Sequence, residues 1–290
     1  MSVLRCSRGK RTNNEERRTK NGERRTPTLL CTVRSCHLPL AREERRVVCP
    51  RGHSFDIARG GYINLLQPQE RRSREPGDSA EAVAARRRFL DRGHAKPLLE
   101  AIRAMVAPHP ALRATLSPGR GQGEGIILDA GCGDGYYLGS LGRGSGIDIS
   151  TAAIDLAARR YPQCEWIVGN ADRFIPYADA SFDLILSITG RMNAAEFRRV
   201  GRGGLLIAVS APDDLIELRG SRGRDRVPRT IETFSDSFEL VKRERATTIA
   251  ELSADDARDI LQATYRPRGE QRPSAVHLSL DLLLFRVKAP

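Results

Sequence analysis

The segment from Ile126 to Tyr137, IILDAGCGDGYY, constrains the fold of this chain more than any other feature. A short apolar run leads into Asp129, and glycines follow at Gly131, Gly133 and Gly135. Glycine permits backbone turns that other residues resist, and the amide groups of a helix that starts after such a turn can face a ligand closely. The segment therefore predicts a buried strand, a glycine-rich turn and the start of a helix.

A second acidic residue strengthens this prediction. Residues 146–149 are typical of a following strand, and Asp148 comes 17 residues after Gly131 (148 − 131). A carboxylate there can accept hydrogen bonds from ribose hydroxyls, as in dinucleotide-binding folds, where the acid follows at ~20 residues. Tyr136 stands where a dinucleotide fingerprint has its third glycine. The D-x-G-x-G-x-G pattern resembles instead the S-adenosylmethionine loop of class I methyltransferases; a glycine-rich turn without a ligand is the alternative.

The rest of the C-terminal part alternates strands and helices, which predicts an α/β fold with a mostly parallel sheet. Strands are expected at 165–169, 182–188 and 203–210, helices at 151–160 and 254–263, and a closing antiparallel pair at 238–249 and 275–287. Ligands bind such sheets at the carboxyl ends of the strands, where the glycine loop, Asp148, Asp172, Thr189 and Asp214 fall. Asp172 is expected to accept a hydrogen bond from the adenine amino group, with a helix cap as the alternative role.

Four potential metal ligands precede this domain: Cys31, Cys36, Cys49 and His53, spaced C-x4-C-x12-C-x3-H. Three thiolates and an imidazole at two short spacings suit a tetrahedral zinc ion. Because protein ligands fill all four positions and the segment is short, the predicted role of the metal is structural. His37 is a competing ligand that we expect to be exposed instead.

Charge is unevenly distributed along the 290 residues, whose net charge is +12. Residues 1–28 hold nine basic and three acidic residues, residues 29–96 hold fourteen and eight, and residues 97–290 hold twenty-five of each. A basic N-terminal third predicts a polyanionic partner, most simply RNA or DNA. Only five of the 48 basic residues are lysines, so an arginine-rich genome is an alternative reason for the count, although not for its asymmetry.

These patterns predict four segments. Residues 1–28 are polar and rich in Glu-Arg-Arg, and are expected to form a disordered basic tail in which Cys6 has no role; an RNA-binding arm, an upstream translation start and a solvated tail all stay open. Residues 29–66 are expected to form a zinc ribbon, 67–96 a basic linker and helix, and 97–290 the methyltransferase domain.

No run of ~20 apolar residues and no signal-peptide core occurs, which predicts a cytoplasmic protein without a membrane partner.

The linker is expected to lead into a helix. Asp78 and Glu81 have the spacing of a capping box, and the helix is predicted to run past Gly93 and through residues 98–106. It carries Arg86, Arg87 and Arg88, for which contacts with phosphate groups and a merely solvated face are both open.

Several linked motifs resemble those of the bacterial 23S rRNA guanine-N1 methyltransferases that carry an N-terminal zinc ribbon. They are CPRGHSFDIARGGYINLL, RRSREPGDSAEAVAARRRFLDRGHAKPL, LDAGCGDGYY, GIDISTAAIDLAARRYPQ and PDDLIELRG, within residues 30–220. The resemblance implies a class I fold with a seven-stranded, mostly parallel sheet, S-adenosylmethionine as donor, zinc in the ribbon, and a 23S rRNA hairpin as substrate, naked or in ribosomal particles. The residues expected to bind the donor are Asp129, Gly131, Gly133, Asp134, Gly135, Asp148, Ile149, Asn170, Ala171, Asp172 and Asp214.

The chain departs from the family pattern at three places. Ala95 replaces a tyrosine expected near the cofactor, Asp214 replaces a histidine, and residues 187–192 (SITGRM) replace a loop of the type I-Y-A-P-C. That loop normally lies against the target base in class I enzymes. The departures are compatible with methyl transfer to a different nucleotide.

The expected chemistry requires placement above all, with the attacking nitrogen held near ~3 Å from the methyl carbon. Guanine N1 carries a proton at neutral pH, so a base or a donor that stabilises the enolate should help. Asp214 is the first candidate base, His94 the second, and Arg191 the candidate for stabilising charge on the carbonyl oxygen; a structural role is the alternative for each. Cys132 and Cys164 are expected to be packing residues.

Two other classes of function are compatible with the sequence. One is a methyltransferase acting on another RNA or a small molecule, and the other is a zinc-ribbon RNA-binding protein with a non-catalytic Rossmann-like domain. A homodimer is compatible with the sequence as well.

Overall fold

An eight-stranded sheet organises the computed structural model, which describes residues 26–70, 73, 75–107, 125–265 and 274–288. The strand order is β10-β11-β9-β8-β5-β6-β7-β4. The central strands run parallel and comprise β5 (Ile127–Ala130), β6 (Ser145–Asp148), β7 (Glu165–Val168), β8 (Phe182–Ile188) and β9 (Gly201–Ser210). β11 (Ala275–Val287) lies antiparallel between β9 and β10 (Phe238–Glu251), which confirms the predicted closing pair.

The eighth strand comes from a segment that the sequence assigned to the zinc ribbon. β4 (Ile63–Asn64) pairs in parallel with β7, with Ile63 opposite Ile167. Ile63 and Leu65 are fully buried, and the Leu65 amide donates to the carbonyl of Val168 at 2.9 Å. The large sheet therefore has one strand more than the seven expected. β4 is added at its edge, where Ile63 and Leu65 become buried.

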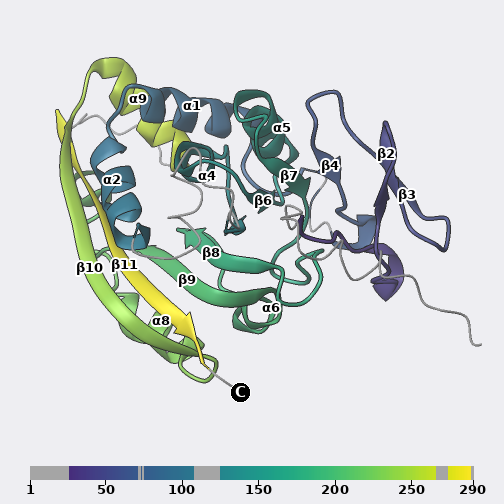
Figure 1. Ribbon diagram of the computed structural model, residues 1–290. Coiled ribbons are helices and arrows are strands. Elements are labelled where there is room, and N and C mark those ends of the chain that lie inside the picture. The colour runs from purple at the N-terminus through teal and green to yellow at the C-terminus, as the bar shows by residue number, and fades with distance from the viewer. Residues whose placement is uncertain (1–25, 71–72, 74, 108–124, 266–273, 289–290) are drawn as a thin grey trace, which may run out of the picture.

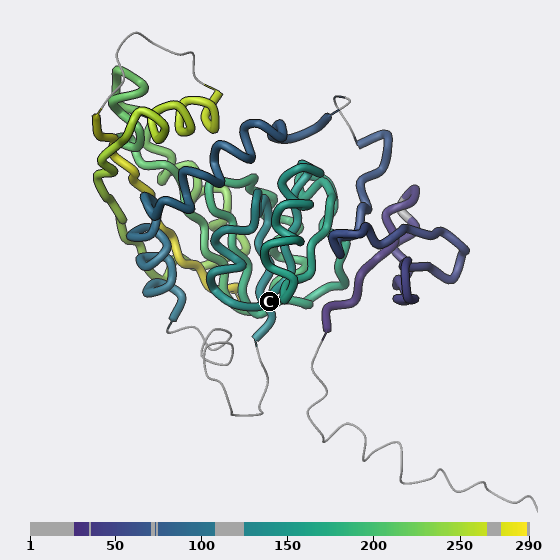
Figure 2. Tube along the Cα trace, turned by 90° about the horizontal axis from the view of Figure 1, so that it is seen from above, coloured from purple at the N-terminus to yellow at the C-terminus, as the bar shows by residue number. Residues whose placement is uncertain are grey.

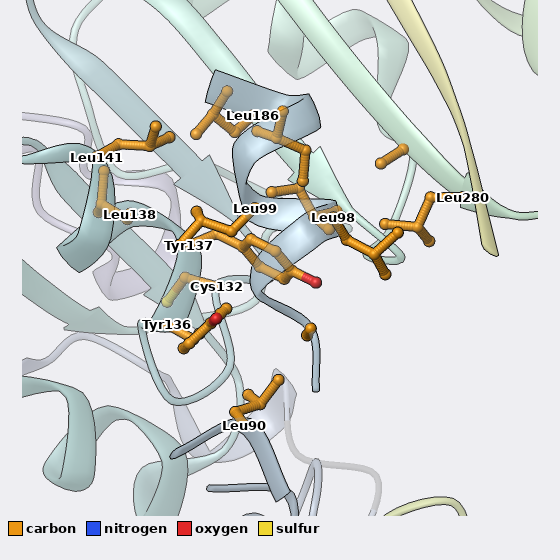
Figure 3. Packing of buried hydrophobic residues seen from close by; sticks show 14 of the residues in the cluster. Leu90, Leu98, Leu99, Cys132, Tyr136, Tyr137, Leu138, Leu141, Leu186 and Leu280 are labelled. Carbon is orange, nitrogen blue, oxygen red and sulfur yellow. The ribbon is translucent and has the colours of Figure 1, made fainter. Parts of the chain in front are cut away.

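Helices cover both faces of the sheet (Figure 1), so its parallel strands are apolar on both sides. One face carries α1 (Ala80–Asp91), α2 (Lys96–Val106), α4 (Tyr136–Leu141), α5 (Thr151–Arg160) and α9 (Ala254–Ala263). The other carries α6 (Ala194–Val200) and α8 (Val227–Phe234), while α7 (Ile216–Arg219) is a single turn after β9. Figure 3 shows the core beneath this first face, to which α1, α2, α4 and β8 all contribute leucines.

The predicted long helix after the linker is interrupted. Ser79, not Asp78, caps α1, since its hydroxyl accepts a hydrogen bond from the Ala82 amide at 3.2 Å. Gly93 then adopts a left-handed φ of +88°, and α2 starts separately at Lys96 with a proline in its first turn. The prediction of one continuous helix was wrong because Gly93 ends the first helix and redirects the chain.

The N-terminal strands form a separate small sheet at one end of the molecule (Figure 2). It consists of β1 (Ala41–Arg42), β2 (Arg46–Val48) and β3 (Ser54–Asp56), all antiparallel, with short 3-10 helices at η2 (Val33–Ser35) and η3 (Pro68–Glu70). The small sheet is tied to the large domain, because the Leu30 amide donates to the Pro176 carbonyl at 2.9 Å.

For two predictions, the outcome depends on which residues the structure describes. Residues 1–25, with Cys6 and most of the predicted basic tail, lie outside them. Within the described part of the chain, no helix is long and apolar enough to cross a membrane.

Candidate functional site

A cavity of about 540 Å³ opens at the carboxyl ends of four parallel strands. Its walls include residues at or just after the ends of β5 (129 and 131–134), β6 (147–149), β7 (169–173) and β8 (188–191). Open α/β sheets bind ligands at this edge, where loops from several strands converge. The location therefore matches the sequence prediction.

The three loop glycines have different roles. All have left-handed backbones, with φ of +81° at Gly131, +54° at Gly133 and +75° at Gly135. Gly131 and Gly133 line the cavity, and a Cβ on Gly131 would lie 3.2 Å from Gly190. Gly135 is not among the lining residues; a Cβ there would lie 2.5 Å from the Trp166 ring. Gly135 thus has a packing role beneath the loop, and its predicted contact with the ligand stays a prediction.

Asp148 is held in a fixed orientation at the cavity wall. Its Oδ2 accepts the Gly133 amide at 2.9 Å and its Oδ1 accepts the Ser150 amide at 2.8 Å. Burial raises the pKa of Asp148 above its ordinary value, and these amide hydrogen bonds oppose the shift. Each carboxylate oxygen retains a second acceptor position, so the group can still accept hydroxyl donors from a ligand.

Asp129 lines the same cavity and is only 1% exposed. Its Oδ1 has no hydrogen-bond partner among the described residues. Burial raises the pKa of Asp129 to about 7, with further contributions from the charges of Asp148 and Asp134, while Arg86 opposes the shift. An unpaired buried carboxylate oxygen beside a cavity is an acceptor for a cationic or donor group of a ligand.

The arginine triplet of α1 divides between the cavity and the protein interior. Arg86 is half-buried and lines the cavity. Arg87 is buried and binds Asp134 at 3.3 Å, Asp91 at 2.9 Å and the Tyr161 hydroxyl at 3.1 Å. Arg88 binds Asp259 at 2.6 Å. The buried Arg87 is therefore not placed for the suggested phosphate contact, whereas Arg88, whose side chain is 51% exposed, stays a candidate for one. Asp134, which lines the cavity, is held by Arg87.

The linker forms part of the cavity wall, which the sequence had not predicted. Gly77 and Asp78 line the cavity, and the Ser150 hydroxyl donates to the Asp78 carbonyl at 2.8 Å. Gly77 has a φ of +85°, and a Cβ there would lie 2.7 Å from the Ser150 Cβ. The available sequence signal was a glycine just before a helix cap, where close backbone approach is common.

The loop after β7 is ordered by its own polar groups. Asn170 Oδ1 accepts the Asp172 amide at 3.1 Å, and the Ala171 carbonyl accepts from Asn193 at 3.1 Å. All three loop residues line the cavity, as does Ile149. No helix begins at Asp172 in the described residues, so the alternative of a helix cap does not hold.

Of the three candidate catalytic residues, the structure places one at the cavity. Arg191 lines it with a side chain that is 80% exposed, and its Nε lies 3.6 Å from Asp172 Oδ2. Asp214 is not among the lining residues; it accepts the Ser279 amide at 3.0 Å and lies 3.5 Å from Arg219.

His94 is also outside the residues that line the cavity. Its Nε2 forms a 2.9 Å hydrogen bond with Asp256 of α9, and its ring packs on Phe89. The roles of His94 and Asp214 as bases, and of Asp214 as a cofactor ligand, stay predictions, and in this structure both side chains bind other residues of the chain. Both side chains connect elements that only the folded chain brings together.

The predicted metal ligands converge. The ligand atoms of Cys31, Cys36, Cys49 and His53 all lie within 4.8 Å of one another, and His53 Nδ1 is 3.3 Å from Cys31 Sγ and 3.4 Å from Cys49 Sγ. A soft set of three sulfurs and one nitrogen fits tetrahedral zinc. His37 is exposed and stacks on Phe174 with ring centroids 4.1 Å apart, so it is not a competing ligand. Cys132 (Figure 3) and Cys164 are buried in the core, as predicted.

Comparison with known proteins identifies both parts of the chain. A zinc-ribbon family described as "RlmA, N-terminal" matches residues 30–74, and a family described as "Methyltransferase domain" matches residues 127–202. The fold, the cavity and these matches define an S-adenosylmethionine-dependent class I methyltransferase that carries a zinc ribbon.

Relatives narrow the class further. A 23S rRNA (guanine(748)-N(1))-methyltransferase of Streptomyces fradiae is 32% identical over 233 residues, which cover 76% of this chain and 79% of that protein. A Micromonospora griseorubida protein provisionally named as a 23S rRNA (guanine-N(1)-)-methyltransferase is 37% identical over 69% of this chain and 72% of its own length. The chain belongs to the family of 23S rRNA guanine-N1 methyltransferases.

Solved structures show more distant similarity. The magnesium protoporphyrin IX methyltransferase of Synechocystis PCC 6803 is 12% identical, with a TM-score of 0.42 over 68% of this chain and 84% of that one.

Proposed function

We propose that this protein transfers a methyl group from S-adenosylmethionine to N1 of a guanine in a 23S rRNA hairpin. The observation that carries this proposal is the 32% sequence identity with the Streptomyces fradiae enzyme over 76% of the chain. The basic N-terminal third fits a nucleic-acid substrate, which a small-molecule substrate would not require. A ribosomal substrate also implies a cytoplasmic protein. Sedimentation of the purified chain tests the homodimer that the sequence left open.

The residues of the cavity fit the methyl donor, whose sulfonium makes its methyl group electrophilic. Asp148, fixed by two backbone amides, accepts the ribose hydroxyls. Asp129 has an unpaired buried oxygen, and we assign it to the ammonium group of the methionine moiety. Arg86, the cation that lines the cavity from α1, is assigned to the carboxylate of that moiety. Asn170, Ala171 and Asp172 form the adenine side.

The target base is assigned to the side of the cavity formed by the loop after β8. Thr189 and Arg191 line it, and Arg191 carries an exposed guanidinium group. A guanidinium group beside the guanine carbonyl oxygen stabilises negative charge there and so favours transfer of the N1 proton to solvent water. Asp172 lies 3.6 Å from Arg191 and orients it. Arg191 is therefore the catalytic residue of this proposal.

The ribbon has a structural role in this proposal. Zinc is held by Cys31, Cys36, Cys49 and His53. These four ligands leave no position for water or substrate, so the role of the ion is structural. The ion orders a small sheet that contacts the large domain and presents a basic surface to RNA.

Incubation with methyl-tritiated S-adenosylmethionine and unmodified large-subunit rRNA tests the proposal, followed by nucleoside analysis. Label in 1-methylguanosine is the expected result. Label in another nucleoside would retain the enzyme class but contradict the base assignment, and would point to the altered loop at residues 187–192. Absence of label from naked rRNA and from ribosomal particles, with the donor bound, would overturn the rRNA assignment.

A further inference from the structure

A second cavity, of about 580 Å³, adjoins the first. The two share Gly190 and Arg191 as lining residues, so the loop after β8 separates them. The opposite wall of the second cavity comes from the segment before α8 and from α8 itself. The residues on that wall are Arg224, Asp225, Arg226, Arg229, Thr230 and Thr233.

This second cavity is strongly basic. Arg224, Arg226 and Arg229 are exposed, and none lies within 4.0 Å of a carboxylate oxygen in the described part of the chain. Asp225 is the one acidic residue among the described residues that line it, and its Oδ1 accepts the Val227 amide at 2.9 Å. Many other exposed arginines of the described chain bind carboxylates, for example Arg202 with Asp183 at 2.6 Å. Unpaired guanidinium groups gathered around a cavity are suited to an anionic ligand.

The basic wall is held in place from behind. Thr230 is 1% exposed, and its hydroxyl lies 3.8 Å from the Met192 sulfur of the loop after β8. Val227 is buried to the same degree, and the Gly223 amide donates to the Pro212 carbonyl at 2.6 Å. The backbone that carries the arginines is therefore fixed relative to the first cavity, so that a ligand spanning both meets a preformed surface.

We propose that this second cavity binds the phosphodiester backbone of the RNA substrate at nucleotides next to the one whose base enters the first cavity. This inference rests on the proposed function, since it takes the first cavity as the place of methyl transfer. Arginine binds phosphate oxygens in a bidentate manner, and such contacts position RNA without reading its sequence. The shared wall at Gly190 and Arg191 keeps the two binding sites adjacent along the strand.

The test compares the full-length protein with a variant in which Arg224→Gln, Arg226→Gln and Arg229→Gln are combined. Binding to a fluorescent 23S rRNA hairpin is measured against salt concentration, and donor binding is measured by calorimetry. Losing three phosphate contacts should make the negative slope of log K against log salt shallower by about 2, so that raising salt from about 50 to 200 mM weakens the variant about twentyfold less than the wild type. Donor affinity should be unchanged, because none of the three residues lines the first cavity.

A control variant removes the same charge elsewhere: Arg258→Gln, Arg286→Gln and Lys242→Gln. These side chains are 48%, 67% and 53% exposed and line neither cavity. The control should retain the wild-type slope, and Arg226→Glu, a change of one exposed side chain, should weaken RNA binding on its own. If the two triple variants had equal slopes while the wild-type protein still methylated rRNA, this inference alone would be overturned. A wild type that binds and methylates no rRNA would overturn the proposed function and this inference with it.

Discussion

Asp129 illustrates how one residue can be unfavourable for the fold and favourable for the ligand. Its carboxyl group is buried beside two other acids, which raises its pKa from 3.8 to about 7. The unfolded chain loses this proton at a lower pH than the folded chain. Stability is therefore highest below the unfolded pKa, falls as the pH rises from 3.8 to about 7, and levels off above that.

The Asp129→Asn variant should be more stable than the wild type in the absence of the donor. The shift corresponds to a penalty on the order of 4 kcal/mol at pH 8, and the advantage of the variant should shrink by about 2 kcal/mol at pH 5.5. Urea unfolding at both pH values measures this difference. Donor affinity should fall in the same variant, since an amide does not provide a charged partner for an ammonium group. A variant that is less stable than the wild type at pH 8 would contradict the explanation.

Asp148 permits a second prediction at the residue scale. Replacing it by Asn preserves the shape of the side chain but weakens the proposed ribose contacts, which should lower donor affinity about 10- to 100-fold. Calorimetry with S-adenosylmethionine measures the effect. Asp236→Asn, at an exposed position outside the cavity, is the matched control and should bind the donor as the wild type does. If the two variants bound the donor with equal affinity, the assignment of Asp148 to the donor site would be wrong.

At the scale of elements, the junction between linker and α1 determines the cavity. Ser79 caps the helix, Asp78 receives the Ser150 hydroxyl, and Gly77 allows the close approach of these two segments. The helix then presents Arg86 to the cavity and turns Arg87 toward Asp134. One helix thus covers the cavity and also orients a residue of the glycine loop.

The Gly77→Ala variant should bind the donor more weakly than the wild type. Its φ of +85° costs an alanine about 1–2 kcal/mol, and the new Cβ would lie 2.7 Å from Ser150. Gly93→Ala is the control, because its φ is +88° with no atom within 4 Å of the new Cβ. Both variants should lose similar stability through the backbone, but only Gly77→Ala should lose donor affinity. If Gly93→Ala weakened donor binding equally, general destabilisation would explain the effect.

At the scale of the whole molecule, the ribbon and the large domain share structure. β4 follows the ribbon directly and joins the large sheet, and the Thr32 hydroxyl donates to the Leu65 carbonyl at 2.7 Å. Arg42 of the ribbon lies 3.4 Å from Glu165 of β7. The metal cluster is thus connected to the edge of the large sheet formed by β4 and β7. The loop after β7 lines the donor cavity.

Removal of zinc should therefore affect RNA methylation more than donor binding. A chelator should release one zinc ion per chain, unfold the small sheet and lower the thermal midpoint. RNA methylation should fall by more than about tenfold, while the donor affinity of the chain changes less. Metal analysis, calorimetry and the tritium assay measure the three effects, and Cys36→Ser should reproduce them. Full RNA methylation by a metal-free chain would contradict a structural role for the ion.

The sequence by itself determined the features that depend on near neighbours. The glycine loop, α5, β8, α9 and β11 follow from hydrophobic periodicity and turn chemistry, which act within a few residues. The set of metal ligands was also predictable, because two short spacings place the ligands on two turns.

Only the tertiary structure decided what depends on distant partners. Arg86 and Arg87 are adjacent in sequence, yet one lines the cavity and the other is buried against Asp134, 47 residues away. His94 is committed to Asp256 by the packing of α1 against α9, and Asp214 to Ser279 by β11. The second cavity was hidden as well: Arg224, Arg226 and Arg229 lie within six residues of one another in the sequence, but only packing places them beside the loop after β8. Such contacts depend on how elements pack, which periodicity and spacing do not encode.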